Sequence, residues 1–318
     1  MFARYNPNIP NWLYFILSLP IGVVFLVFCT AVVYDLSHLA ITKIPLNNKR
    51  RNFFKKGLDY SSLVVALGLT SRSVYEAKHI ELETVDIKLK NLKQPYKIVQ
   101  LSDIHIGGLI DQKFIKNLVD RVNTLEPDLV VITGDLVDVA LKYAKPSLDE
   151  LTKLKSVYGT YFIVGNHEYF HNIEEIIKVM KQLEITVLEN NYSYIGEQNK
   201  GFNLAGVYDV MGYRVGHHQP DIEKALKGVD KNSPVVLLAH QPRFIEEVDD
   251  SIDLVLSGHT HGGQIYPFRI LVKLVQPYIA GLYNHSKHTQ IYVNKGTGFW
   301  GPPMRLGSSS EITLINIS

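Results

Sequence analysis

Residues 129–138 read LVVITGDLVD. An apolar run, LVVIT, ends at Gly134 and Asp135, and a second carboxylate follows at Asp138. A short, β-branched apolar run bounded by glycine is typical of a buried strand, and the glycine lets the backbone approach other groups closely. The stretch therefore predicts a strand that ends at the edge of a sheet and presents a carboxylate there.

The same pattern, an apolar run that ends in polar residues, recurs from about residue 84 onward. The predicted strands are Tyr96 to Leu101, Leu129 to Thr133, Tyr161 to Val164, Phe202 to Ala205, Val235 to Ala239, Leu254 to Leu256, Gln290 to Val293 and Ile312 to Ile317. The predicted helices are Gln112 to Leu125, Ser147 to Ser156, Ile173 to Leu183 and Ile222 to Gly228. This mixture of strands and helices predicts one α/β domain over residues 84–318.

Four other strand ends carry side chains that bind metal ions in many proteins. They read LSDIH at 101–105, GNHE at 165–168, AHQP at 239–242 and GHTHGG at 258–263. In the D-x-H and H-T-H fragments, a spacing of two puts both side chains on one side of an extended segment. Any one fragment alone is more often a capping or core feature, but the five together predict a metal site.

In order, the chain shows D-x-H, G-D-x-x-D, G-N-H-E, a later His and G-H-T-H, which resembles the calcineurin-like metallophosphoesterase superfamily over residues 95–318. The extended SGHTHGGQ at 257–264 and NKGTG at 294–298, with Arg305, look like the membrane-associated branch of bacterial phosphodiesterases. Some relatives in that branch hydrolyse UDP-2,3-diacylglucosamine in lipid A biosynthesis. The resemblance implies a four-layer α/β/β/α sandwich of two mixed sheets with a dinuclear site at the strand ends.

Carried over by position, the resemblance implies seven ligands for two divalent ions. Asp103, His105 and His261 would hold one ion; Asn166, His240 and His259 would hold the other; Asp135 would bridge them. His167 would be the catalytic acid beside the leaving group, although a histidine near the start of the Ile173 helix can also be structural. Asp138 and Glu168 would orient the ligands, and Glu168 stands where many relatives carry Asp.

This ligand set suits phosphoryl transfer, because two divalent ions outweigh the negative charges of Asp103 and Asp135 and leave a cationic site. Paired ions about 3.5 to 4 Å apart can hold both oxygens of an in-line displacement and lower the pKa of a bound water, which makes hydroxide the expected nucleophile. A departing alkoxide needs a proton, and imidazole is suited to supply it. Nitrogen and oxygen ligands without thiolate favour Mn, Fe or Zn.

The amino-terminal part of the chain predicts a membrane anchor. No charged residue lies between Trp12 and Tyr34, and about 20 apolar residues suffice to cross a bilayer. A buried core helix is the alternative, but aromatic residues near both ends favour the membrane interface. We therefore expect a transmembrane helix within residues 1–40 and a basic linker with a weak second apolar segment over 41–83.

The charges of the linker bear on membrane orientation. Lys43, Lys49 to Arg51, Lys55 and Lys56 follow the apolar run, and positive residues favour the cytoplasmic side. The apolar run from Leu58 to Leu69 is short and contains Asp59, so it fits a weak span, an interfacial helix or a signal-type segment. RRNFFK at 50–55 resembles a twin-arginine export signal, which favours an extracytoplasmic domain at the cell membrane; a simple stop-transfer cluster is the alternative.

The charge balance of the chain excludes one class of substrate. Lys plus Arg total 33 against 31 for Asp plus Glu, so no nucleic-acid polymer is expected as a partner.

Two further segments could lie near the substrate or the membrane. The apolar residues 266–283 with Arg269 and Lys273 fit a segment pressed on anionic lipid or a helix packed on the domain. Residues 206–218 could form a wall of the pocket or a plain surface loop. Cys29 is the single cysteine and supports neither a disulfide nor a thiolate site.

Three hypotheses follow from the sequence. The favoured one is a membrane-anchored phosphoesterase that acts on a phosphodiester or pyrophosphate, with a lipid-linked molecule such as UDP-2,3-diacylglucosamine as the candidate substrate. The second is a nucleotide phosphodiesterase or nuclease on the same metals. The third is a non-catalytic metal-binding membrane scaffold, which should lack a ligand or His167, and neither is missing.

Overall fold

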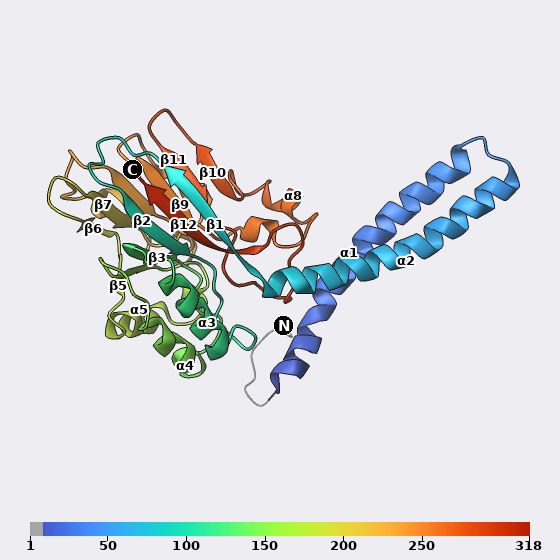
Figure 1. Ribbon diagram of the computed structural model, residues 1–318, viewed down its shortest axis with the longest axis horizontal. Coiled ribbons are helices and arrows are strands. Elements are labelled where there is room, and N and C mark those ends of the chain that lie inside the picture. The colour runs from blue at the N-terminus through green and yellow to red at the C-terminus, as the bar shows by residue number, and fades with distance from the viewer. Residues whose placement is uncertain (1–8) are drawn as a thin grey trace.

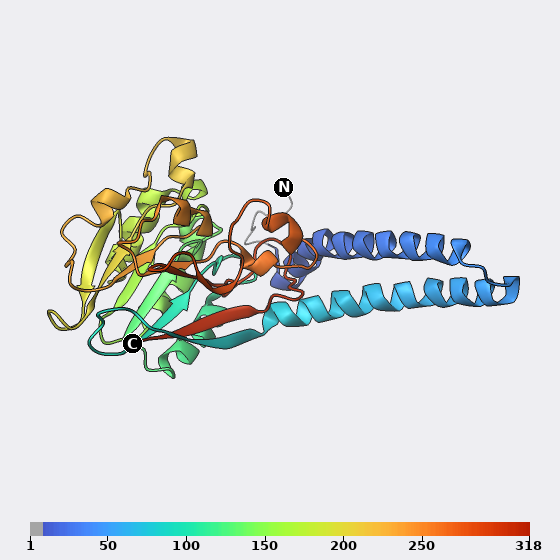
Figure 2. The same ribbon diagram turned by 90° about the horizontal axis from the view of Figure 1, so that it is seen from above.

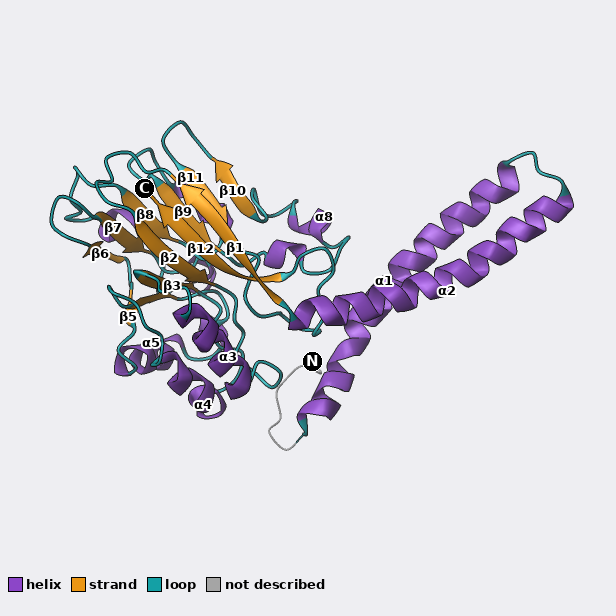
Figure 3. Cartoon of the chain, in the orientation of Figure 1, coloured by secondary structure: helices purple, strands orange, loops and turns teal. Residues whose placement is uncertain are grey.

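The computed structural model describes residues 9–318. A hairpin of two long helices, α1 (Asn11–Lys43) and α2 (Asn48–Lys78), precedes an α/β domain that begins with β1 (Ile80–Ile87). In Figures 1 and 2 the hairpin projects from one end of the domain, and α2 leads directly into β1. Figure 3 distinguishes the purple hairpin from the orange strands of the domain.

The first of two sheets has six strands in the order β1-β12-β2-β3-β4-β5. Its remaining strands are β2 (Tyr96–Leu101), β3 (Leu129–Thr133), β4 (Thr160–Ile163), β5 (Thr186–Val187) and β12 (Ser310–Ile317). Strands β2 to β5 pair in parallel, and β12 pairs antiparallel with β2. Parallel neighbours need crossover connections, and α3 (Gln112–Asn123), α4 (Leu141–Leu151) and α5 (Ile173–Gln182) lie in these connections.

The second sheet also has six strands, in the order β10-β11-β9-β8-β7-β6. They are β6 (Asn191–Ile195), β7 (Phe202–Gly206), β8 (Val235–Leu238), β9 (Leu254–Ser257), β10 (Gly281–Asn284) and β11 (Gln290–Val293). The four central strands pair in parallel, and the edge strands β6 and β10 pair antiparallel. Both sheets are therefore mixed.

The sheets pack against each other because their strands are apolar on both faces. In β3, Leu129 and Val131 belong to a core that includes Leu204 and Leu256 of the second sheet, while Val130 and Ile132 belong to a core shared with α3, α4 and α5. Short helical segments, α7 (Ile222–Ala225) and the 3-10 helix Pro242–Glu247, cover the outer face of the second sheet. The predicted α/β fold of two mixed sheets is confirmed.

The eight predicted strands are all present, within two residues of their expected ends. Strands β1, β5, β6 and β10 were not predicted; β5 has only two residues, and β6 and β10 lie at sheet edges with half-exposed side chains. The helix expected from Ser147 begins instead at Leu141, because Ala144, Leu148 and Leu151 form one buried face and Pro146 is accommodated inside the helix.

The segment expected as a basic linker differs from that prediction, because residues 48–78 form one continuous helix, α2. The Asn47 side chain caps its start by accepting a hydrogen bond from the Arg50 amide, and the helix then packs along α1. Strand β1 begins at Ile80, before the expected domain start at residue 84. Helix α1 is the one helix among the described residues that is long and apolar enough to cross a membrane, with a mean hydropathy of 2.7 in its most apolar window.

Candidate metal centre

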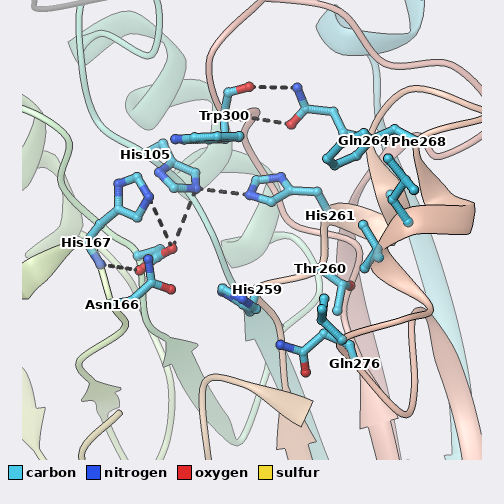
Figure 4. Close-up of a pocket in the computed structure, with 15 residues that line it drawn as sticks. His105, Asn166, His167, His259, Thr260, His261, Gln264, Phe268, Gln276 and Trp300 are labelled. Atoms are coloured by element: carbon cyan, nitrogen blue, oxygen red, sulfur yellow. Dashed lines mark hydrogen bonds and ion pairs between the residues drawn. The ribbon is translucent and has the colours of Figure 1, made fainter. Parts of the chain in front are cut away.

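The seven predicted ligands come from five loops and lie in one cluster. Five of them, His105, Asp135, Asn166, His259 and His261, line a cavity (Figure 4), and Asp103 and His240 are buried beside His261 and Asp135. Asp103 and His105 follow β2, Asp135 follows β3, Asn166 follows β4, His240 follows β8, and His259 and His261 follow β9. These strands run parallel within their sheets, so their carboxyl ends meet at the same edge. The topology, rather than closeness in sequence, assembles the cluster.

Three of these side chains form what we call the first ligand group, Asp103, His105 and His261. His105 Nε2 lies 3.0 Å from His261 Nε2, and His261 Nε2 lies 3.4 Å from Asp103 Oδ1. One donor atom from each of the three residues lies within 4.8 Å of the others. Two imidazole nitrogens and a carboxylate at such separations suit a first-row divalent cation.

The second ligand group comprises Asp135, His240 and His259, and Asn166 lies beside it. His240 Nε2 is 3.3 Å from Asp135 Oδ2 and 3.1 Å from Asn166 Oδ1. The same Asp135 oxygen lies 3.9 Å from His105 Nε2 in the first group. The Asp135 carboxylate is therefore within reach of both groups, as a bridging ligand needs to be.

The backbone at this cluster is strained. Asp103, His105, Asp135, His259 and His261 all have positive φ angles, between 50° and 69°. This left-handed region is uncommon for residues other than glycine, and residues held in it cluster at functional sites. The fold therefore maintains an unfavourable backbone conformation in order to aim these side chains at one point.

Burial sets the protonation of two of the histidines. Desolvation lowers the pKa of His259 to about 3 and also lowers the pKa of His261 well below its usual range. Both imidazoles are therefore neutral near pH 7, the form that binds metal ions. By contrast, the nearby carboxylates, Asp135 first, raise the pKa of His240 despite its burial.

Hydrogen bonds fix the orientation of other rings. His240 Nδ1 lies 2.8 Å from the Thr133 carbonyl oxygen, which can only accept, so Nδ1 carries the hydrogen and Nε2 faces the cluster. His105 Nδ1 lies 2.9 Å from Asp138 Oδ1, and its Nε2 faces His261. Partners of this kind fix the tautomer of metal-binding histidines and raise their basicity.

His167, the predicted acid, lies beside the cluster at the cavity wall. Its Nδ1 is 2.6 Å from Asp138 Oδ1, its Nε2 is 3.9 Å from Asp135 Oδ2, and its amide donates to Asp135 Oδ1 over 2.8 Å. Although burial opposes the charged form, Asp135 and then Asp138 raise the pKa of His167 to about 9. The ring is thus oriented by a carboxylate and is able to carry a proton.

Glu168 holds two of the ligand loops together. Its carboxylate is fully buried and accepts hydrogen bonds from the amides of Gly165, Asp135, Leu136 and Val137, over 2.6 to 3.2 Å. Burial raises the pKa of Glu168 to about 7, while the amide donors oppose that rise. The extra methylene of Glu relative to Asp lets one carboxylate reach the loops after both β3 and β4.

Arg305 supports the metal centre from behind His261, a role that the sequence did not predict; there it served only as part of the family resemblance. It is fully buried, its Nη2 lies 3.0 Å from His261 Nδ1, and it donates to the carbonyls of His261, Gly296, Gly298 and Ser308. Desolvation lowers the pKa of Arg305 to about 10, so it remains charged at neutral pH. The guanidinium thus holds the last histidine loop against the 296–308 segment.

The cavity has a volume of about 380 Å³ and two kinds of wall. Five of the seven predicted ligands and His167 line one side, and Phe268, Leu271, Val272 and Trp300 line an apolar side. Trp300 was not singled out from the sequence, yet its ring lies edge-on to His167 with the centroids 6.3 Å apart. Residues 206–218, expected as a wall or a surface loop, contribute nothing to this lining; Tyr169 instead binds the His218 carbonyl outside it.

Comparison with known proteins places this site in a family. A family model described as calcineurin-like phosphoesterase matches residues 96–263. A Helicobacter pylori protein named as an uncharacterized metallophosphoesterase is 40% identical over 319 residues, which cover 99% of this chain and 85% of that protein. A Danio rerio protein named as a transmembrane protein with metallophosphoesterase domain is 38% identical over 247 residues, 75% of this chain and 56% of that protein.

A Bos taurus protein with the same name as the Danio rerio one is 41% identical over 230 residues, 68% of this chain and 52% of that protein. The matched region of the family model contains the loops after β2, β3, β4, β8 and β9. The resemblance inferred from the sequence motifs is confirmed: the chain belongs to the calcineurin-like phosphoesterase family.

Proposed function

We propose that this protein is a membrane-anchored hydrolase of phosphodiester or pyrophosphate bonds that uses two divalent cations, Mn, Fe or Zn. The observation that carries the proposal is that the first and second ligand groups lie side by side at one end of the cavity, with the Asp135 carboxylate within 3.3 Å of His240 and 3.9 Å of His105. The donors are imidazole nitrogens and carboxylate or amide oxygens, which fit these cations. We assign Asp103, His105 and His261 to one cation and Asn166, His240 and His259 to the other.

Two cations at these groups would polarise a phosphoryl oxygen and activate a water at neutral pH. The side chains around the two cations would bind the substrate and orient the proton donor. Asp138 holds Nδ1 of His167, so Nε2, 3.9 Å from Asp135 Oδ2, is the nitrogen that would give a proton to a leaving oxygen. The rings of His259 and His261 are neutral, and Asp135 carries one negative charge. With two divalent cations bound, the cavity would therefore keep a net positive charge, which favours an anionic phosphate.

Turnover of bis(p-nitrophenyl) phosphate tests the hydrolase proposal. Detergent-solubilised protein is stripped with a chelator and reloaded with Mn, Fe or Zn in turn. We expect turnover that returns with metal and disappears with chelator. No turnover of any phosphoester under any metal would contradict the proposal and favour a metal-binding scaffold.

For the natural substrate we propose a lipid-linked phosphodiester or pyrophosphate, of which UDP-2,3-diacylglucosamine is one example. The support is that the apolar wall of the cavity adjoins α1, since Phe268 of the wall packs edge-on against Phe25 with centroids 6.2 Å apart. An apolar wall next to an apolar helix matches the acyl chains of a lipid. Competition between a lipid pyrophosphate and a cyclic or linear nucleotide for the same turnover tests this choice, and preference for the nucleotide would contradict it.

We further propose that the protein resides in the cytoplasmic membrane with the α/β domain on the extracytoplasmic side. The tip of the hairpin, which carries Lys43, Lys49, Arg50 and Arg51, lies at the end of α1 and α2 farthest from the domain (Figures 1 and 2). Positive residues favour the cytoplasm, so the domain would face the other side. In that orientation the substrate would be a lipid phosphoester outside the cell. UDP-2,3-diacylglucosamine, which is made in the cytoplasm, would be the substrate only in the opposite orientation.

A further inference from the structure

We propose that the segment formed by residues 266–276, which we call the α8 segment, is immersed in the bilayer beside α1, so that the cavity opens toward lipid. Its helix, α8 (Arg269–Val272), has no buried residue. Around it Phe268, Ile270, Leu271, Leu274 and Val275 are 44% to 78% exposed. An exposed apolar group of this size is unusual for a soluble surface and marks an interaction site.

The α8 segment lies against the apolar helix α1, and together they form one apolar surface. Ile265, just before it, joins a buried cluster with Leu26 of α1 and Met304 of the domain. Close by, Arg305 donates its amide hydrogen to the Ser73 carbonyl of α2 over 2.8 Å, and Gly307 donates to Glu76 over 3.0 Å. The domain is therefore docked on the hairpin at this point, and the α8 segment is held at the level of Phe25.

The neighbouring surface of α1 is itself apolar. Ile21, Val24 and Phe28 flank the contact and are 62% to 66% exposed. If these side chains face hydrocarbon, as the composition of α1 indicates, then exposed apolar side chains of the α8 segment at the same level face it too. Moving such apolar surface from water into lipid is favourable.

The charges of the α8 segment fit a lipid surface. Arg269 and Lys273 are its charged residues, and the segment contains no Asp or Glu. Long cationic side chains keep their charge at the headgroups while their stems lie in apolar surroundings, and they are attracted to anionic lipid. This composition specifies a bilayer rather than a second protein surface as the occupant.

The same segment lines the cavity on its other side. Phe268, Leu271, Val272 and Val275 face the cavity that His259 and His261 line, whereas Ile270 and Leu274 do not line it. A lipid that leaves the bilayer along this segment would therefore bring its phosphate to the ligand groups while its chains remain against apolar side chains. The inference depends on the proposed anchoring by α1 and deepens the proposed lipid substrate, but immersion itself needs no catalysis.

Depth-dependent quenching in vesicles tests the immersion. The full chain with Cys29→Ser carries one environment-sensitive fluorophore on Leu274→Cys, Phe28→Cys or Val157→Cys, and is reconstituted with lipids that bear a quencher in their chains. Leu274, Phe28 and Val157 are 78%, 63% and 72% exposed, so each label perturbs few contacts. We expect quenching at positions 274 and 28 and none at 157; quenching at 28 alone, or at none of the three, would overturn the inference.

A double variant, Ile270→Asp with Leu274→Asp, supplies a functional readout with Val157→Asp as the matched control. We expect the double variant to lose turnover of a vesicle-borne phosphoester while turnover of soluble bis(p-nitrophenyl) phosphate is unchanged. Equal turnover of the vesicle-borne ester by both variants would overturn the inference. Absence of all turnover in the unsubstituted protein would instead contradict the hydrolase proposal, and the quenching result would still decide immersion.

Discussion

The Asp138 carboxylate is shared by two imidazoles with different tasks. Its Oδ1 accepts from Nδ1 of His105, a proposed ligand, over 2.9 Å and from Nδ1 of His167, the proposed acid, over 2.6 Å. Although burial opposes its charge, these two rings hold the pKa of Asp138 below its usual range, so it is ionised at neutral pH. One carboxylate thus couples the orientation of the acid to that of the metal site.

Replacing Asp138 tests this coupling. Asp138→Asn keeps the size of the side chain but removes the charge that orients both rings. We expect turnover at saturating metal to fall by about 10- to 100-fold, the effect typical of losing such a partner. Asp120→Asn, on an exposed pair with Lys116, is the matched control and should leave turnover unchanged. Equal rates for the two variants would show that Asp138 orients nothing that the reaction uses.

Asp209 gives a prediction about pH. It is buried, its Oδ1 accepts from Gln241 and from the Met211 amide, and its Oδ2 has no hydrogen-bond partner in the described part of the chain. Burial raises its pKa to about 6, against about 3.9 in an unfolded chain. Between these values the native protein binds more protons than the unfolded one, so its stability falls as pH rises through this window.

In Asp209→Asn this titration is absent. The apparent melting temperature of metal-free protein should therefore decline less between pH 4 and pH 6 than that of the unsubstituted protein. Thermal unfolding followed by circular dichroism measures the difference, again with Asp120→Asn as the control. An unchanged pH dependence would mean that Asp209 is not a protonated buried carboxyl in this range.

At the residue scale, sequence reasoning reached the ligand candidates because each follows an apolar run, as Asp135 follows LVVIT. It did not identify Trp300, and it expected residues 266–283, which contain Phe268, to lie on lipid or on the domain without predicting their place in the cavity wall. The loops that carry both residues fold across the cavity without a periodic pattern. The role of Arg305 was also out of reach, because its partners are mostly backbone carbonyls brought together by the loop geometry.

Among elements, the contact between the hairpin and the domain depends on one small residue. A Cβ atom at Gly22 of α1 would lie 2.5 Å from Met304 Sδ, which is fully buried, whereas a Cβ at Gly68 of α2 would meet nothing within 4 Å. The helix therefore approaches the domain closely at Gly22, where a side chain would push the two apart.

Gly22→Leu should destabilise this contact by about 1 to 3 kcal/mol, the usual cost of overpacking, while Gly68→Leu should not. Both changes replace glycine by the same residue inside a long helix, so helix propensity cancels in the comparison. Limited proteolysis of the loop around residues 300–307 in detergent measures the loosening as faster cleavage. Equal cleavage of the two variants would contradict the docked arrangement.

The elements that sequence predicted best are the parallel central strands, such as β2, β3 and β11, whose ends match the prediction. These strands are buried on both faces, so nearly every position is apolar, and the sequence of each strand differs clearly from the polar loops on either side. Helix α2 was missed as a continuous element because its charges and Asp59 interrupt the apolar pattern. In the fold, packing along α1 and the bond from Tyr34 to Asp59, 2.7 Å, support it instead.

For the whole molecule, the hairpin and the domain together specify an orientation. The start of α1 and the domain lie at one end of the hairpin, and the basic tip lies at the other. In intact bacterial cells we expect an impermeant thiol reagent to label Val157→Cys and not Asn52→Cys, both in the Cys29→Ser background, because the domain faces outward. Labelling of Asn52→Cys alone would reverse the proposed orientation.

We propose that the first and second ligand groups, bridged by Asp135, hold two cations that the chain needs for phosphoester hydrolysis. The most direct measurement determines, on the same preparation, the metal content per chain and the turnover of bis(p-nitrophenyl) phosphate for the unsubstituted protein and for Asp135→Ala. For the unsubstituted protein we expect two bound ions and turnover. For Asp135→Ala we expect loss of metal and a rate reduced by more than roughly 100-fold, the upper range for residues that only hydrogen-bond to a metal ligand. Asp135→Ala protein that hydrolyses the ester at the unsubstituted rate, or active protein without bound metal, would contradict it.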